Sequence, residues 1–183
     1  VDAHTDSQRR QAMRVGETLV LTAGLWLWRP GSRPDDLHAT LRISAPAGVE
    51  ISAPWPLLPD GSYQLHESAF RWPSRAVFGT FEHHVVEPEG LGMRLDVAVL
   101  PLPRRCTAAG VQRWLRVAAE AVVQAYGRAP VARVQVIVAP VARPGADQPV
   151  MFGMALRGGG PAVALLVNAL AADSDLPGEW VAI

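Results

Sequence analysis

The chain has 183 residues, and its 17 basic and 17 acidic side chains give it a formal net charge of zero. This balance argues against nucleic acid or an anionic membrane as the main partner, because both bind basic surfaces. Apolar residues make up 49% of the chain, which is enough for a hydrophobic core, and no apolar run is long enough to span a bilayer. All basic residues are arginine and there is one cysteine, so lysine chemistry and a disulfide framework are excluded.

The first hundred residues have the pattern of β-strands. Apolar and polar side chains alternate over residues 37–44 and 93–99, with the period of two expected for a half-buried strand. Further strand candidates are rich in apolar and aromatic residues and comprise residues 18–28, 63–72 and 76–86. Short strands separated by turns favour an antiparallel β-sandwich domain over residues 1–100.

A helix and three strands are expected in the α/β piece that follows, residues 101–183. Thr107 is a good N-cap, apolar residues recur at helical spacing to residue 126, and Gly127 is a helix stop. The expected strands of this piece are residues 134–138, 150–157 and 162–167. The sequence thus predicts a mainly β protein with an α/β part, namely an N-terminal antiparallel β-sandwich followed by a partial mixed sheet with one long helix.

One helix can cover only one face of that mixed sheet. The other face needs a cover, which could be the β domain, a second copy of the chain in a homo-oligomer, or further sequence.

The histidines have no spacing typical of a metal site. His83 and His84 are adjacent on an expected strand, so their side chains point to opposite faces and cannot chelate one ion together. His4, His38 and His66 have no ligand spacing to one another, and the chain contains no HExxH and no paired CxxC. Residues 173–175, Asp-Ser-Asp, start like a calcium loop but lack its later acidic ligands, which favours a plain turn.

Cys106 is a candidate reactive thiol. It lies beside Arg104 and Arg105 and just before the expected helix, and both cations and a helix N-terminus lower a thiol pKa. The competing interpretation is an incidental cysteine, because reactivity also requires exposure.

Gly158, Gly159 and Gly160 are the candidate substrate-binding residues. One interpretation of the run is a plain hairpin turn between two strands. The other is a sheet edge whose free amides bind an extended peptide. Trp55 is held rigidly between Pro54 and Pro56, where it could be exposed and contact a ligand or a neighbouring domain, and packing between domains is its favoured use.

The order of these parts is similar to the glycyl-aminopeptidase-like zinc metallopeptidases of the gluzincin group. Members of that family begin with a β-sandwich domain, and the catalytic domain follows with a helix, a strand and a glycine-rich sheet edge before its HExxH helix. The segments that carry the resemblance are Ala53-Pro54-Trp55, Tyr63-Gln64-Leu65, Ala76-Val77-Phe78-Gly79, residues 107–126, residues 134–138, residues 152–168 and Trp180-Val181-Ala182-Ile183.

The resemblance implies an N-terminal part of such an enzyme, truncated just before the zinc-binding helix. In HExxH two histidines one turn apart bind zinc and the glutamate between them is the general base. This chain contains no such motif. It should therefore bind no catalytic zinc and cleave nothing, while zinc and a peptide substrate belong to the full-length parent. The apolar run after Pro177-Gly178 also has the look of an element cut short.

Two other classes of function stay open. The chain could be a secreted or periplasmic β-sandwich module that binds a ligand or a partner protein without catalysis, or a small enzyme built on Cys106. The expected location is the periplasm or the outside of the cell, with the cytoplasm as the alternative, because the polar start of the chain is not a signal peptide but could follow a removed one.

Overall fold

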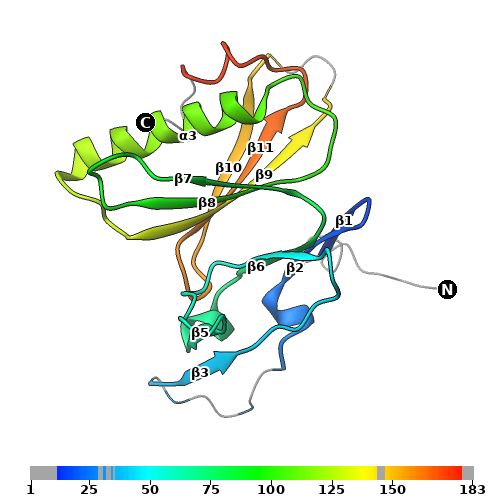
Figure 1. The fold of residues 1–183 in the computed structure, drawn as a ribbon, viewed down its shortest axis with the longest axis vertical. Helices are drawn as coiled ribbons and strands as arrows, with labels where there is room; N and C mark the ends of the chain where they lie inside the picture. The colour runs from blue at the N-terminus through cyan, green and yellow to red at the C-terminus, as the bar shows by residue number, and fades with distance from the viewer. Residues whose placement is uncertain (1–11, 29–30, 32–33, 35, 144–146, 179–183) are drawn as a thin grey trace. The chain divides into compact units, whose positions relative to one another are not determined.

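The structure is a computed structural model that describes residues 12–28, 31, 34, 36–143 and 147–178. It is mainly β with one long helix, which confirms the predicted fold class (Figure 1). The chain forms two compact units, Val1–Phe81 with Leu156–Ala162, and Glu82–Ala155 with Val163–Ile183. The predicted boundary at residue 100 therefore lies inside the second unit.

Two antiparallel sheets form the first unit. The larger sheet has the strand order β1, β2, β6, β4, with bounds Ala12–Val15, Thr18–Thr22, Arg75–Gly79 and Glu50–Ser52. The smaller sheet pairs β3 (His38–Leu41) with β5 (Tyr63–His66). Their inner faces share one core, which includes Ala76 of the larger sheet and Tyr63 and Leu65 of the smaller. This shared core is what a β-sandwich requires.

Several of the predicted strands are shorter than the sequence pattern indicated, or are divided. The strand expected over residues 63–72 ends at His66, and a short helix, α2 (Ser68–Arg71), follows it. The strand expected over residues 76–86 is two strands, because Gly79 has a φ of +126° and lies so close to the backbone of Glu17 that a Cβ atom there would be 2.5 Å from its carbonyl oxygen. The strand expected over residues 18–28 ends at Thr22 in a 3-10 turn, η1 (Ala23–Leu25).

A five-stranded mixed sheet forms the second unit. Its strand order is β10, β11, β9, β8, β7, with bounds Val150–Leu156, Ala162–Asn168, Arg133–Val141, Arg94–Val99 and Glu82–Val86. β7 is antiparallel to β8, and β8 is parallel to β9. The helix α3 (Ala108–Tyr126) connects β8 to β9 and covers one face of the sheet (Figure 1). These pairings explain why residues 82–100 group with the second half of the chain.

The ends of α3 are those that the sequence predicts. The Thr107 hydroxyl accepts a hydrogen bond from the amide of Gly110 at 3.0 Å, and Gly127 closes the helix with a φ of +71°. Val111, Trp114 and Leu115 pack against the sheet. Within the described residues, no helix is both long and apolar enough to cross a membrane.

Small and apolar residues of β8 and β9 lie on the sheet face opposite α3. Ala98, Ile137 and Ala139 alternate with the residues that contact α3, and each is at most 4% exposed. The homo-oligomer expected to cover this face stays a prediction.

Asp96 lies on this face and joins the two parallel strands β8 and β9. Its carboxylate is 5% exposed and accepts a hydrogen bond from Nε of Arg94 at 2.8 Å and a second from Nε of Arg133. Burial alone would raise the pKa of Asp96, but the hydrogen bonds and charges of the two arginines outweigh it and lower the pKa.

We expect Asp96→Asn to lower the free energy of unfolding at pH 7 by about 1–3 kcal/mol, because two charge-assisted hydrogen bonds are lost at a buried site. The folded-state pKa of Asp96 is depressed, so its contribution is complete above the unfolded value of about 3.9 and is lost as the pH falls through the folded value. Acid should therefore destabilise the wild type more than the variant. Urea unfolding followed by tryptophan fluorescence between pH 2 and pH 7 measures both effects.

Glu87→Gln is the matched control. Glu87 contacts the same Arg94 at 3.2 Å, but both side chains are about half exposed, so its loss should cost no more than about 1 kcal/mol. Equal effects of the two substitutions would contradict the role given to Asp96.

Candidate functional site

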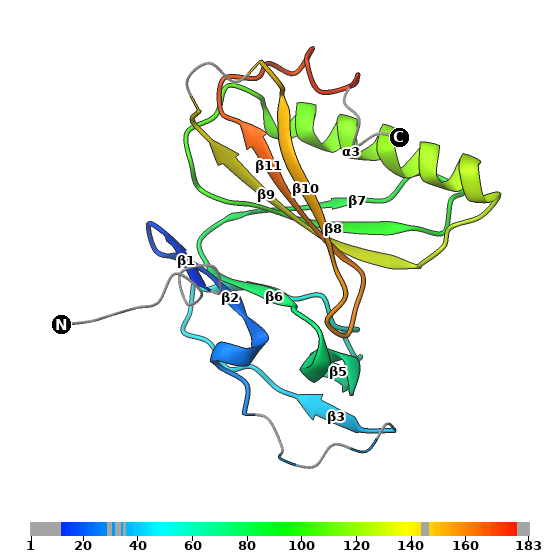
Figure 2. The ribbon, with the colours of Figure 1, turned by 180° about the vertical axis from the view of Figure 1, so that it is seen from behind.

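The strand β10 forms one edge of the mixed sheet. Within the described chain its neighbour in the sheet is β11, which lies beside it along its length (Figure 2). Phe152, in the middle of β10, is 48% exposed. An edge strand presents unpaired backbone groups to which an extended peptide can add by strand pairing.

The glycine turn that joins β10 to β11 is packed closely against other backbone. The indole Nε1 of Trp55 donates a hydrogen bond to the carbonyl oxygen of Gly158 at 3.0 Å, and this bond is buried. A Cβ atom on Gly158 would lie 2.6 Å from the carbonyl oxygen of Trp72, and one on Gly160 would lie 1.9 Å from that of Pro54. Gly159 has a φ of +85° and donates its amide to the carbonyl of Arg157 within the turn.

All three glycines are thus explained by packing within the first unit. The predicted hairpin turn is present, and each glycine is there because a side chain would not fit or because the backbone is left-handed. The prediction that these glycines bind a peptide stays a prediction, and the amide of Gly159 is already used inside the turn.

Trp55 is fully buried, so it packs inside the protein and is not exposed to a ligand. Its ring contacts those of Trp26 and Tyr63, at centroid distances of 5.9 and 6.2 Å. It lies in the core of the first unit, where its N–H reaches the glycine turn. A buried tryptophan normally finds such a hydrogen-bond acceptor.

Gly160→Ala should destabilise the protein by about 1–3 kcal/mol, because the added methyl group collides with backbone rather than with a side chain that can move. The matched control is Gly178→Ala, since a Cβ atom there meets nothing within 4 Å. Thermal unfolding by circular dichroism compares the two. If Gly160→Ala were as stable as Gly178→Ala, the close approach described for the turn would be wrong.

Cys106 is 3% exposed, and this burial raises the pKa of its thiol despite the opposing charge of Arg104. The reactive-thiolate interpretation is therefore wrong, and with it the enzyme built on Cys106 loses its basis. The sequence shows the arginines and the helix start that lower a thiol pKa, but it does not show the burial that dominates.

Asp173, in the loop after β11, binds the N-cap residue Thr107 of α3, a role that sequence reasoning missed. Its carboxylate accepts hydrogen bonds from the amide of Thr107 at 2.7 Å and from its hydroxyl at 2.6 Å. These bonds, the hydroxyl first, lower the pKa of Asp173. The expected turn at residues 173–175 is confirmed, because the amide of Asp175 donates to the carbonyl of Ala172 at 3.1 Å.

The structure describes four of the five histidines, and His4 lies outside the described residues. His83 and His84 are neighbours on β7, where His84 approaches Glu82 at 3.4 Å. His38 and His66 face each other across β3 and β5, with ring centroids 4.7 Å apart. Within the described residues, no three histidine, cysteine or acidic side chains are grouped closely enough to hold a metal ion.

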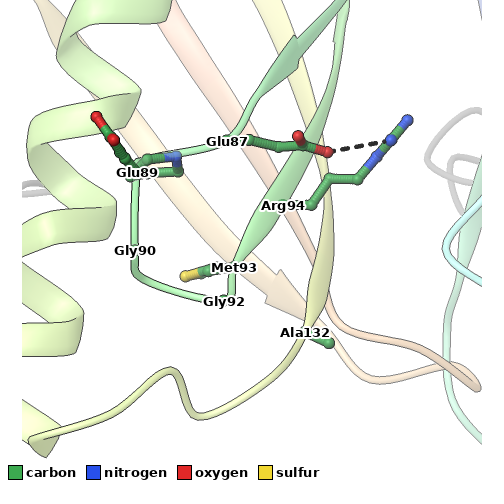
Figure 3. Close-up of a pocket in the computed structure, with 8 residues that line it drawn as sticks. Glu87, Glu89, Gly90, Gly92, Met93, Arg94 and Ala132 are labelled. Carbon is green, nitrogen blue, oxygen red and sulfur yellow. Dashed lines mark hydrogen bonds and ion pairs between the residues drawn. The ribbon is translucent and has the colours of Figure 1, made fainter.

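A pocket of about 480 Å³ lies at the loop between β7 and β8 (Figure 3). Its lining is formed by Glu87, Pro88, Glu89, Gly90, Gly92, Met93, Arg94 and Ala132. Figure 3 shows that the carboxylate of Glu87 points toward Arg94, with which it forms an ion pair. The charged residues of its lining are two glutamates and one arginine, and the lining includes no histidine, hydroxyl or thiol.

A second pocket lies at the carboxyl ends of β8, β9 and β11. Its residues are mostly apolar, with two arginines among them, and they are Leu102, Pro103, Arg104, Arg105, Pro140, Ala142, Ala169 and Leu170. Arg104 is held by Glu82 at 2.6 Å, while Arg105 is exposed. The carboxyl ends of parallel strands are a common place for ligands in α/β folds.

Comparison with known proteins adds a likeness in fold. No family model and no curated protein matches the sequence. Among solved structures, the aminopeptidase N family protein from Idiomarina loihiensis superposes with a TM-score of 0.60 at 15% identity, over 91% of this chain and 27% of that chain. The M1 zinc metallopeptidase from Deinococcus radiodurans gives a TM-score of only 0.34 at 15% identity, over 70% of this chain and 29% of that chain.

The first of these likenesses defines the fold. The chain has the fold of a part of an aminopeptidase N family protein, and it spans about a quarter of that protein's length. At 15% identity the likeness concerns the fold alone.

Proposed function

We propose that this chain is the N-terminal part of a zinc metallopeptidase of the glycyl-aminopeptidase-like, gluzincin kind. The observation that carries the proposal is the fold likeness to an aminopeptidase N family protein, which extends over 91% of the chain and both of its units. The order of parts supports it, since a β-rich unit comes first and a mixed sheet with one long helix follows.

The chain's own residues do not fit a catalytic zinc. The sequence contains no HExxH, and no group of three suitable ligands occurs in the part of the chain that the structure describes. Zinc, where the parent enzyme holds it, would polarise the peptide carbonyl and activate a water molecule. Peptide-bond hydrolysis is thus assigned to the longer parent protein, and the chain itself is proposed to be non-catalytic, in the periplasm or outside the cell.

The part assigned to this chain is to position the peptide. β10 is an edge strand with an exposed aromatic side chain, so an extended peptide can pair with its backbone and rest against Phe152. Gly158, Gly159 and Gly160 directly follow β10, where they would flank such a peptide.

Phe152→Lys should weaken binding of a short extended peptide with an N-terminal glycine by at least about fivefold, because a charged residue on an edge strand opposes further pairing. Val85→Lys is the matched control, since Val85 is similarly exposed (40%) and lies on β7, the opposite edge of the same sheet. Isothermal titration of the 183-residue chain measures both. Equal loss in the two variants, or no binding by the wild type, would reject β10 as the peptide edge.

The parent protein gives the second test. We expect the gene that encodes these residues to continue into an HExxH motif, and the purified parent to release N-terminal residues from peptides in a chelator-sensitive way. Residues 1–183 alone should show no such activity. A gene without HExxH beyond Ile183 would sink the proposal.

A non-catalytic binding module is the alternative, and the arginine-containing pocket at the carboxyl ends of β8, β9 and β11 favours it. Apolar walls with a few polar groups suit a small amphipathic ligand. The test on the parent protein distinguishes the two proposals, because only the metallopeptidase proposal requires the parent to hydrolyse peptides.

A further inference from the structure

His38 and His66 form a pair that the strand register creates. They are 28 positions apart in the sequence, but β3 and β5 are antiparallel and place them directly opposite each other. Their rings are nearly perpendicular, at 80°, with centroids 4.7 Å apart. Within the described part of the chain, the partner of each imidazole is the other imidazole.

The pair lies on the outer face of this two-stranded sheet. Side chains alternate along the strands, so Leu65 and Tyr63 enter the core while His66 and His38 do not. His38 is exposed and His66 is half-buried. Both rings can therefore rotate toward a common ion without disturbing the packed core.

The geometry of the pair suits one ion between two imidazoles. Residues directly opposite on antiparallel strands have Cβ atoms about 5 Å apart, which is within reach of two converging side chains. Two imidazoles that bind one ion with metal–nitrogen distances of about 2.1 Å and a tetrahedral angle have ring centres about 5 Å apart. The observed 4.7 Å is close to that separation before any adjustment.

We propose that His38 and His66 form a two-histidine chelating site for a divalent ion of the copper, nickel and zinc group. Imidazole nitrogen prefers these ions, whereas magnesium and calcium prefer oxygen ligands. Because no third histidine, cysteine or acidic side chain joins the pair within the described residues, water completes the coordination. The site is an exchangeable surface site, independent of the catalytic zinc proposed for the parent protein.

Metal binding at this pair links two strands that only the folded chain brings together. An ion that binds the folded state alone raises the apparent stability as its concentration rises. The metal should therefore raise the melting temperature of the wild type and leave that of His38→Asn and His66→Asn unchanged.

The test uses the tag-free 183-residue chain in a His4→Asn background and titrates it with Cu²⁺, Ni²⁺, Zn²⁺ and Mg²⁺ by isothermal calorimetry. His38→Asn and His66→Asn should each weaken binding at least tenfold. The matched control is His83→Asn, an exposed histidine on β7, which should change nothing. Copper should bind most tightly, and magnesium should not bind.

Melting temperatures without metal check that each variant folds, and the histidine proton signals in NMR spectra identify the rings that bind. Loss of binding in His38→Asn and His66→Asn with shifted signals of both rings in the wild type supports the site. Unchanged binding in either variant, an equal loss in His83→Asn, or no binding by the wild type overturns it.

Discussion

The close approach of residues 158–160 to the backbone at residues 54 and 72 is the constraint on which the first unit depends. A hydrogen bond joins Trp55 to Gly158 across 103 positions of sequence, in the middle of an aromatic cluster. Only glycine fits there, because Cβ atoms at positions 158 and 160 would overlap backbone atoms. The first unit is therefore completed by residues Leu156–Ala162, which follow its main part, ending at Phe81, by some 75 positions in the sequence.

The division into these two units depends on long-range strand pairing, which a change of composition along the sequence does not show. A change of composition near Pro101 suggested a linker, whereas the units are defined by strand pairing and by the return of residues 156–162. Local signals were reliable where local physics decides, as at the N-cap Thr107 and the stop at Gly127. They failed where a distant contact decides, as at Gly79, whose neighbour is Glu17.

The candidate site residues show the same division. The sequence offered two uses for the three glycines, and only the positions of Pro54 and Trp72 show that packing requires them. For Cys106 the sequence showed the groups that lower a thiol pKa, while burial, which raises it, depends on the folded chain. The histidine pair at positions 38 and 66 depends on the register of β3 with β5. The spacing of histidines along the sequence does not reveal that register.

The packing role of the glycine turn is compatible with the proposed part of β10 in binding a peptide. A strand edge binds an extended peptide more tightly when it is ordered beforehand, since less conformational entropy is then lost on binding. The turn that follows β10 is itself well fixed, since the carbonyl of Gly158 accepts a hydrogen bond from Trp55 and Gly160 lies against Pro54. The proposed peptide would therefore pair with β10, the strand that precedes the glycines, and not with the glycine amides. Its first contact would be with the exposed side chain of Phe152.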